Sequence, residues 1–382
     1  MAKLARPHLF ADKKSPDASK SGHSTYSTRT KGTSMKSLLT TIAIACTAAC
    51  ASMASMAQSS VTLYGSLDAG AYSKQLSGET RMKTLTSGIM NASRWGISGS
   101  EDLGDGLKAR FDLSSYISMD TGIAGRNGTD GFWQRYSWVG LEGKFGLARV
   151  GRMSTPNFIN TIRFNPFADS SLSPVFMQTY VGSGAQPMMT SHGATDSAWS
   201  NSLAYTTPVW GGLQIALQAA ADEGTGSGRR LGGSAYYGTG PFAIGLSLEN
   251  LSRMSLNFSK PPASILMNDA KSIQLGTSYD LGVVKFFAQG QHEELENASV
   301  TIKLKTGQIG ASVPIGLGKL LVSYARTDKT QTAVADLKRD TASVGYDYFL
   351  SKRTDLYAVV NSDKVSNLNR GTGVALGIRH NF

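Results

Sequence analysis

An alternation of apolar and polar residues with a period of two constrains the fold of this chain more than any other feature. In residues 61–71, Val61 and Leu63 occupy one parity, while Tyr64 and Asp68 occupy the other. Successive side chains of a β-strand point to opposite faces, so this pattern predicts a strand with one apolar and one polar face. The same pattern recurs in residues 107–113, 213–221, 242–249, 284–291 and 374–382. No segment after residue 57 shows a convincing helical period, and we therefore expect an all-β fold.

The connections between the expected strands alternate between short turns and longer polar segments. Seven short turns lie at residues 101–106, 143–146, 208–212, 238–241, 280–282, 314–318 and 350–354. Eight longer segments lie near residues 73–90, 120–131, 154–197, 222–229, 252–270, 293–299, 328–338 and 363–372. Fifteen connections join sixteen strands, and each strand with its connection takes roughly 20 residues, which suits spanning strands of ~9–11 residues.

The alternation of connection lengths favours strands that cross a membrane, because hairpins then place every short turn on one side. A soluble β-sandwich gives no reason for this alternation. A barrel of sixteen strands is wide enough to hold water, so its polar face lines the lumen and its apolar face contacts lipid. The predicted fold is a 16-stranded antiparallel transmembrane β-barrel, closed because unpaired backbone groups are costly in hydrocarbon. Its short turns are expected to be periplasmic and its long loops extracellular.

A leader is expected before the barrel. Residues 35–57 combine a basic start, an apolar run and a small-residue cleavage site ending at Ala57, which is typical of a signal peptide for export. Residues 1–34 have no periodicity and are interpreted as a non-structural N-terminal extension, which leaves the translation start at either Met1 or Met35. We assign the barrel to residues 58–382. A membrane anchor formed by the apolar run and a lipid anchor at Cys50 are the alternatives to cleavage.

Removal of the leader changes the charge of the chain. The full chain has 38 Lys and Arg against 27 Asp and Glu, and eight of the basic and two of the acidic residues precede residue 58. The remaining 30 basic and 25 acidic side chains form no basic stripe with interleaved aromatic residues, so we expect no nucleic-acid partner. Both cysteines, Cys46 and Cys50, also lie in the leader. The exported chain therefore needs a means of stabilisation other than disulfides, such as a sheet closed on itself.

Residues 58–382 contain no persuasive catalytic or metal-binding pattern. The three histidines, His192, His292 and His380, lie in a loop, at a strand end and on the apolar parity. No Ser/His/Asp spacing and no Cys/His cluster is present. We therefore expect no catalytic residue, no metal, no cofactor and no enzymatic activity. A barrel enzyme and an exported β-rich adhesin are the less favoured alternatives.

Several motifs in the chain resemble those of Gram-negative general diffusion porins. They occur in order at residues 60–65 (SVTLYG), 93–104 (SRWGISGSEDLG), 139–152, 201–205 (NSLAY) and 377–382 (GIRHNF). The resemblance extends over essentially all of residues 58–382. It implies a homotrimer of outer-membrane barrels that pass small hydrophilic solutes and ions by passive diffusion. It also implies contacts with outer-membrane lipid and lipopolysaccharide, and recognition by the barrel-assembly machinery.

The longest connection, residues 154–197, is the main candidate for the functional site. In the porin family the corresponding third loop folds into the barrel and narrows it, and the aromatic content of this segment favours a packed loop over an exposed one. Residues 165–169 (NPFAD) are its most porin-like part. The resemblance makes Asp169 the expected carboxylate of the pore constriction, with Asp196 as a weaker candidate.

The family also places a ladder of arginines on the barrel wall opposite the loop. Arg94 and Arg152 lie in the two best-matching motifs, and Lys108 and Arg110 share the polar parity of the adjoining strand. A third family arginine has no counterpart at residues 198–200. The surplus of basic wall residues predicts a modest preference for anions.

Two further functional interpretations remain open. An aromatic C-terminal residue is the assembly signal of this family, which assigns that role to Phe382; the alternative is a strand end at the membrane interface. Tyr64, Tyr236 and Phe287 share the polar parity of their strands, which keeps open a substrate-specific channel for sugars or for organic and aromatic acids.

Overall fold

The structure is a computed structural model that describes residues 59–126, 130–181, 197–223, 228–257 and 264–382. The expected N-terminal extension, the signal peptide and Asp196 lie outside these residues, so the interpretations attached to them remain predictions.

In the described residues, seventeen strands form one closed sheet, and two more form a separate hairpin. The strands of the closed sheet are β1 (Ser60–Lys74), β2 (Met82–Ser87), β3 (Arg94–Gly104), β4 (Leu107–Tyr116), β5 (Tyr136–Gly143), β6 (Gly146–Ser154), β7 (Ala198–Thr206), β8 (Leu213–Ala220), β9 (Arg230–Thr239), β10 (Phe242–Leu251), β13 (Asp269–Asp280), β14 (Lys285–Glu296), β15 (Thr301–Ile315), β16 (Gly318–Gln331), β17 (Val334–Phe349), β18 (Thr354–Val365) and β19 (Gly371–Asn381). The hairpin consists of β11 (Met254–Asn257) and β12 (Ser264–Met267).

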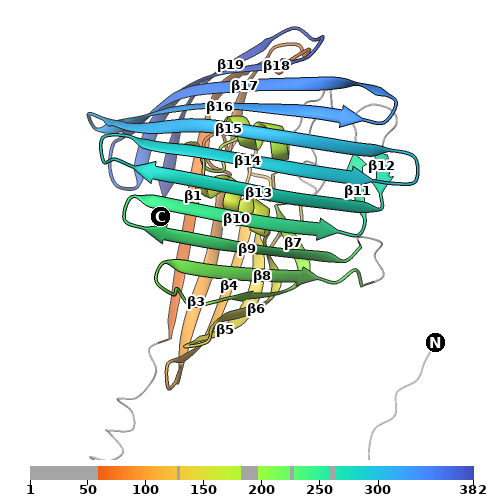
Figure 1. The fold of residues 1–382 in the computed structure, drawn as a ribbon. Coiled ribbons are helices and arrows are strands. Elements are labelled where there is room, and N and C mark those ends of the chain that lie inside the picture. Colours follow the sequence, from red (N-terminus) through yellow and green to blue (C-terminus); the bar gives the residue numbers. More distant parts are fainter. Residues whose placement is uncertain (1–58, 127–129, 182–196, 224–227, 258–263) are drawn as a thin grey trace, which may run out of the picture. The chain divides into compact units, whose positions relative to one another are not determined.

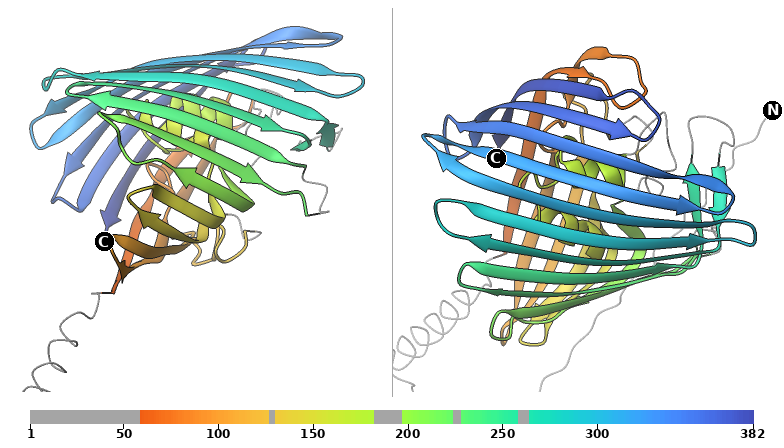
Figure 2. Two further views of the ribbon diagram at one scale, coloured as in Figure 1. Left: turned by 60° about the horizontal axis from the view of Figure 1, so that its bottom comes forward. Right: turned by 45° about the horizontal axis from the view of Figure 1, so that its top comes forward.

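The sheet closes because its last strand, β19, pairs with its first, β1. Strand β1 also pairs with β3 through residues 60–66 and with β2 through residues 69–74, so β2 and β3 are two halves of one wall position. The seventeen strands therefore occupy sixteen positions, and the predicted 16-stranded antiparallel barrel is confirmed (Figure 1, Figure 2). Between the two halves, residues 88–93 leave the wall, and Ile89 packs in a buried cluster with Phe167.

The two parities of the strands separate as the sequence predicts. In β1, Val61 and Leu63 are exposed on the outer face, whereas Ser66 and Asp68 are buried on the inner face. Exposed apolar side chains continue around the outer face, among them Val139, Leu203, Leu217, Leu248, Leu275, Ile309, Val344, Val360 and Leu376. A band of this kind suits contact with acyl chains, while the polar parity faces the lumen.

The connections follow the predicted alternation, with one correction. All seven predicted short turns join neighbouring strands at one end of the barrel, and the β11–β12 hairpin lies at the opposite end (Figure 1). Two of the predicted long connections, at residues 293–299 and 328–338, are largely strand instead, and the connection at residues 363–372 is half strand. Cross-strand ion pairs support these extensions: Lys303 Nζ lies 2.5 Å from Glu294 Oε1, and Arg326 Nη1 lies 3.5 Å from Asp340 Oδ1.

The expectation of no helix was wrong for the segment after β6, which contains α2 (Pro156–Arg163), α3 (Pro174–Phe176) and the π-helical turn η1 (Met177–Val181). The Thr155 hydroxyl caps α2 by accepting a hydrogen bond from Phe158 N at 3.2 Å. Asn, Ile and Thr are weak helix formers, so this short helix depends on its cap and on packing against the wall. Within the described residues, no helix is both long enough and apolar enough to cross a bilayer.

Candidate functional site

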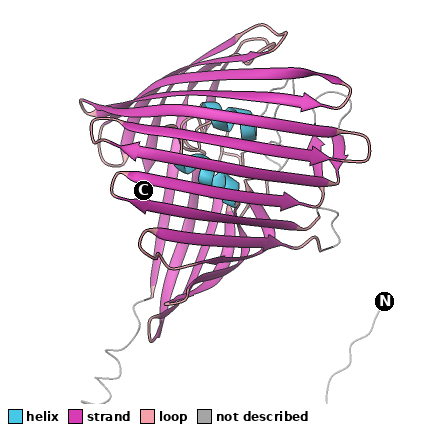
Figure 3. Ribbon diagram, in the orientation of Figure 1, coloured by secondary structure: helices cyan, strands magenta, loops and turns pink. Residues whose placement is uncertain are grey.

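The described part of the long loop, residues 155–181, folds into the barrel, as the sequence predicts. Figure 3 shows its helices, in cyan, inside the ring of strands. Side chains of the inner wall hold the loop: Asn160 Nδ2 donates to Gln274 Oε1 at 3.1 Å, and Gln289 Nε2 donates to Phe164 O at 3.0 Å. The loop therefore occupies one side of the lumen along β10, β13 and β14.

Two wall glycines make room for this close approach. A Cβ atom at Gly276 would lie 2.3 Å from Cδ2 of Phe164, and one at Gly245 would lie 2.6 Å from Cε2 of the same ring. The ring is fully buried between the loop and the wall. A larger side chain at either position would displace the loop toward the open part of the lumen.

A buried ion pair fixes the far end of the loop. The side chains of Arg339 on β17 and Asp363 on β18 are both 0% exposed, with Nε 2.8 Å from Oδ1. Arg339 Nη1 donates to Met177 O at 2.9 Å, and Gln178 Nε2 donates to Ala325 O at 2.9 Å. The loop is thus bound to the wall at both ends of its described part.

The loop carboxylate Asp169 faces Arg94 across the lumen side of β3. Arg94 Nη1 lies 3.6 Å from Asp169 Oδ2, and each side chain is only 19% exposed. Arg94 also donates to the Asn91 side chain and, at 3.0 Å, to Ala92 O. Two of the residues predicted for the constriction are therefore close together in the structure.

A second arginine of this wall, Arg135, was not among the predicted residues. It lies immediately before β5, where the sequence analysis identified no alternation, so the face on which it lies could not be inferred from parity. Its Nη1 lies 3.4 Å from Tyr64 OH and 3.3 Å from Ser114 Oγ, and its guanidinium lies 4.1 Å from the Tyr136 ring. Its charge is near enough to that of Arg94 for the two to repel each other.

Two of the predicted basic residues, Lys108 and Arg110, lie nearer to the short turns than Arg94 and Arg135 do. Register places Arg110 and Lys108 on the same inner face as Trp138. Arg110 Nη1 forms an ion pair with Glu142 Oε2 at 2.8 Å, so its charge is matched. These residues line the lumen but are not in contact with Asp169.

The remaining predicted arginine, Arg152, does not join this group. Arg152 is paired with Ser137 of β5 in the register. The cross-strand pair two residues away, Val139 and Val150, points outward, with the side chains 61% and 59% exposed. Arg152 Nη1 donates to Ser200 Oγ at 2.9 Å. Arg152 is two residues after Val150, so both side chains belong to the same parity of the strand, and this parity indicates the outer face. The family motif had suggested the lumen instead.

Two further lumen arginines were missed. Arg149 on β6 and Arg110 on β4 are both paired with Gly140 of β5, which lies between them, so the two arginines share the inner face. Arg149 Nη2 donates to Thr206 Oγ1 at 3.3 Å. Arg163, the last residue of α2, is exposed on the loop, with its guanidinium 4.0 Å from the Tyr236 ring. The loop itself therefore contributes a cation as well as the carboxylate of Asp169.

Above the constriction, the connection between β4 and β5 carries a neutralised pair. Arg126 donates to both carboxylate oxygens of Asp130, at 2.8 and 2.9 Å, and these hydrogen bonds hold the pKa of Asp130 below its ordinary value. The Arg126 guanidinium lies 4.6 Å from the ring of Tyr116, which pairs with Arg94 in the register. This arginine adds little net charge near neutral pH.

The C-terminal residue lies at the seam of the barrel. Gly65 N donates to Phe382 O at 2.9 Å, and Phe382 N donates to Gly65 O at 3.1 Å. The Phe382 ring covers Gly65, where an added Cβ would lie 2.4 Å from Cζ of that ring. This placement is compatible with both roles considered for Phe382, and the assembly signal remains a prediction.

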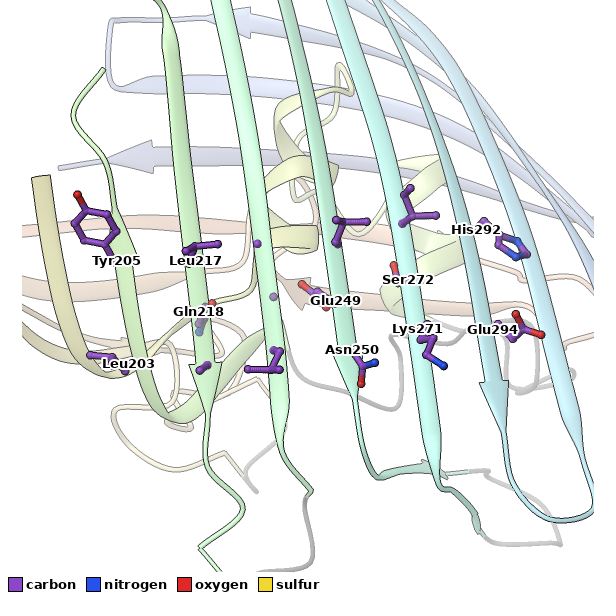
Figure 4. Close-up of a pocket in the computed structure, with 16 residues that line it drawn as sticks. Leu203, Tyr205, Leu217, Gln218, Glu249, Asn250, Lys271, Ser272, His292 and Glu294 are labelled. Carbon is purple, nitrogen blue, oxygen red and sulfur yellow. The ribbon is translucent and has the colours of Figure 1, made fainter. Parts of the chain in front are cut away.

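A large hollow, of about 800 Å³, lies on the outer face rather than in the lumen. Its floor is formed by outward apolar residues such as Leu203, Leu217 and Leu248, and Lys271 and Glu294 lie toward its long-loop end (Figure 4). It belongs to the apolar band and is not part of the solute path.

Comparisons with known proteins agree with this geometry. A sequence profile described as Gram-negative porin matches residues 40–368. Outer membrane porin protein 32 of Delftia acidovorans is 35% identical, over 85% of this chain and 95% of that relative. The major outer membrane protein P.IB of Neisseria meningitidis serogroup B is 28% identical with the same coverage. The solved structure of an anion-selective porin from Comamonas acidovorans gives a TM-score of 0.70 at 29% identity, over 85% of this chain and all of that one. This chain therefore belongs to the Gram-negative porin family.

Proposed function

We propose that this outer-membrane porin passes small hydrophilic solutes by diffusion and favours anions over cations. The observation that carries the preference is an imbalance of charge on the lumen side. Among the described residues of this part of the lumen, five guanidiniums face three carboxylates. Asp169 and Glu142 are each paired with an arginine, and Asp112 accepts a hydrogen bond from Tyr64 OH at 2.6 Å, whereas Arg135, Arg149 and Arg163 form no ion pair. The path next to the loop therefore carries surplus positive charge.

The narrowness of the path makes this surplus effective. Water screens charges strongly in bulk, but a gap between a loop and a wall contains few water molecules, so the effective dielectric constant falls. Fixed guanidiniums then raise the local concentration of small anions, and they stay charged at all working pH values. The name of the relative from Comamonas acidovorans, an anion-selective porin, supports the same preference.

The test is the reversal potential of the purified protein in a planar bilayer under a KCl gradient. We expect discrete conductance steps and a potential whose sign corresponds to Cl⁻ permeating faster than K⁺. Conductance with a clear preference for K⁺ would overturn the proposed selectivity while leaving diffusion intact. Absence of conductance from correctly inserted protein would overturn the channel function itself.

A homotrimer is part of the proposal. The structures similar to this chain include the trimer form of an outer-membrane protein of Vibrio cholerae, with a TM-score of 0.64 at 14% identity. Chemical cross-linking in outer-membrane vesicles should give a three-subunit species, and a monomer alone would contradict it. Contacts with lipopolysaccharide and recognition of Phe382 by the assembly machinery are further parts of the proposal, the latter testable by the yield of inserted protein after deletion of Phe382.

The second candidate function is a substrate-specific channel. The Tyr64 and Tyr236 side chains both lie on the lumen side, and each is next to an arginine, Arg135 and Arg163 respectively. Paired aromatic and cationic groups would suit aromatic carboxylates. Liposome swelling separates the candidates, because uptake rates that follow solute size indicate general diffusion, whereas saturation by one solute indicates a specific channel.

A further inference from the structure

Asp68 is a fully buried carboxylate on the inner face of β1, and each of its two oxygens accepts two hydrogen bonds. Its Oδ1 accepts from Ile89 N at 3.1 Å and from Tyr357 OH at 2.7 Å. Its Oδ2 accepts from Met90 N at 3.0 Å and from Asn91 N at 2.9 Å. An ionised carboxylate is an acceptor only, so it suits three converging backbone N–H groups better than any neutral side chain.

The backbone of Asp68 holds the two ends of the same segment. Its carbonyl accepts from Gly88 N at 2.9 Å and from Ser93 Oγ at 2.8 Å, and Ser93 Oγ in turn accepts from Asp68 N at 2.9 Å. Gly88 has a φ of +73°, the left-handed conformation that starts the departure from the wall. Residues 88–93 are therefore fixed at both ends and in the middle by one residue of β1.

This segment holds the wall side of the constriction. Arg94 follows it directly, and the Arg94 guanidinium donates to the Asn91 side chain and to Ala92 O. Asn91 is itself one of the residues whose N–H binds Asp68. Asn91 therefore links the Arg94 guanidinium to the buried carboxylate of Asp68, through its side chain and its backbone N–H respectively.

The same segment also holds the loop side. Ile89 O accepts hydrogen bonds from Ser170 Oγ at 2.8 Å and from Ser171 N at 3.0 Å, and these two serines directly follow Asp169. Ile89 N is bound to Asp68. Both charged partners of the constriction are therefore anchored to one short segment.

We propose that Asp68 is the positioning residue of the constriction, because its carboxylate fixes the segment that sets the separation of Arg94 and Asp169. The inference rests on the proposed function in one respect, that the charges at this point control ion selectivity. Asp68 itself is excluded from the lumen solution and acts on permeating ions only through the groups that it holds.

The test is the substitution Asp68→Asn in the full protein, purified from outer membranes and recorded in planar bilayers. An amide of the same size keeps one acceptor oxygen but turns an NH₂ group toward the donors of the other oxygen, so the middle of residues 88–93 loses part of its anchor, while the backbone bonds of residue 68 to Gly88 and Ser93 remain. We expect greater open-channel current noise. We also expect the shift in reversal potential produced by Arg94→Gln to fall to about half or less when Asp68→Asn is already present, because the two sites are coupled.

Asp347→Asn is the matched control. Asp347 is another wall carboxylate, 1% exposed and bound to Arg379 at 3.1 Å, and no contact joins it to residues 88–93 in the described structure. Its neutralisation should leave the noise and the Arg94 effect unchanged. If Asp68→Asn only lowers the resistance of the barrel to unfolding, like any loss of a buried partner, the role is structural and the inference is wrong.

Each remaining outcome is decisive. Absence of conductance in the wild type removes the proposed function, whereas a conducting wild type with an unchanged Arg94 effect in the Asp68→Asn background overturns this inference alone. No effect of Arg94→Gln in the wild type also overturns it, because no selectivity would then depend on the positioned pair. If Asp68→Asn does not insert, Asn91→Ala replaces it, since this change keeps the backbone N–H for Asp68 and removes the side-chain acceptor of Arg94, leaving the bond to Ala92 O. An unchanged effect of Arg94→Gln in that background overturns the inference.

Discussion

At the residue scale, the position of each arginine relative to the strand pattern decides its function. Arg94 starts a strand on the inner parity, and it lies 3.6 Å from the loop carboxylate. Arg152 shares the parity of Val150 and lies on the outer face. Arg135 lies just outside a strand, where alternation gives no information, yet it contacts Tyr64 in the lumen. A family motif indicated which segments matter, but the side of the wall follows from local backbone geometry.

Arg135→Gln should weaken the preference for anions. Removal of a unit charge about 5 Å from a permeating ion changes the energy of that ion by roughly 1 kcal/mol even at the dielectric constant of water. We therefore expect the anion-to-cation permeability ratio, obtained from the reversal potential, to fall several-fold. Arg152→Gln is the matched control, and an equal shift from both variants would show that Arg135 has no special place in the path.

At the element scale, the loop and the wall were predictable to different degrees. The sequence predicts the strands and all seven short turns, because each rests on local alternation or on turn residues. It also predicts that residues 154–197 fold inward, through family resemblance and the aromatic content of the segment. Helix α2 was not predicted, since its weak helix formers depend on Thr155 and on wall contacts that are distant in sequence. The segment at 88–93 was missed for the same reason, because its anchor, Asp68, is about twenty residues earlier.

Gly276→Ala should narrow the pore. The added methyl group would overlap the Phe164 ring, which forces the loop away from the wall at a cost of about 1–3 kcal/mol. The expected result is a lower single-channel conductance together with a lower denaturant midpoint in detergent. Gly307→Ala serves as the control, because no heavy atom lies within 4 Å of the added group. Equal conductance in both variants would contradict a loop packed on Gly276.

Asp363→Asn should loosen the far end of the loop. The change leaves the fully buried guanidinium of Arg339 without its charged partner, which typically costs about 3–5 kcal/mol. We expect a lower free energy of unfolding and closure of the channel at smaller applied voltages. Asp340→Asn, which breaks a partly exposed outer pair with Arg326, should change stability by only about 0–1 kcal/mol. Equal losses in the two variants would contradict the anchoring role of the buried pair.

At the scale of the whole molecule, the account depends on which face of the sheet meets lipid. Leu217 is 57% exposed on the outer face, and its neighbour Ala216 faces inward, paired with Thr206. Apolar side chains outside and polar side chains inside exclude a soluble barrel with an oily core. The hollow on the outer face fits this orientation, since its floor belongs to the same apolar band.

Arginine substitutions at these adjacent positions should have opposite results. Leu217→Arg places a charge in the acyl region and should destabilise the inserted barrel by about 2–4 kcal/mol. Ala216→Arg adds a cation to the lumen, so the barrel should insert normally and become more selective for anions. The yield of heat-modifiable protein in the outer membrane measures the first effect, and the reversal potential measures the second. Equal yields of the two variants would contradict the assigned faces.

The most direct test of a water-filled barrel with a positively charged constriction is single-channel conductance as a function of KCl concentration. The Debye length grows from about 3 Å at 1 M to about 30 Å at 0.01 M, so fixed charges dominate the lumen only in dilute salt. We predict discrete steps whose conductance falls less steeply than bulk conductivity as the salt is diluted, because the lumen retains chloride. Strict proportionality to bulk conductivity would contradict the charged constriction, and the absence of steps from inserted protein would contradict the channel.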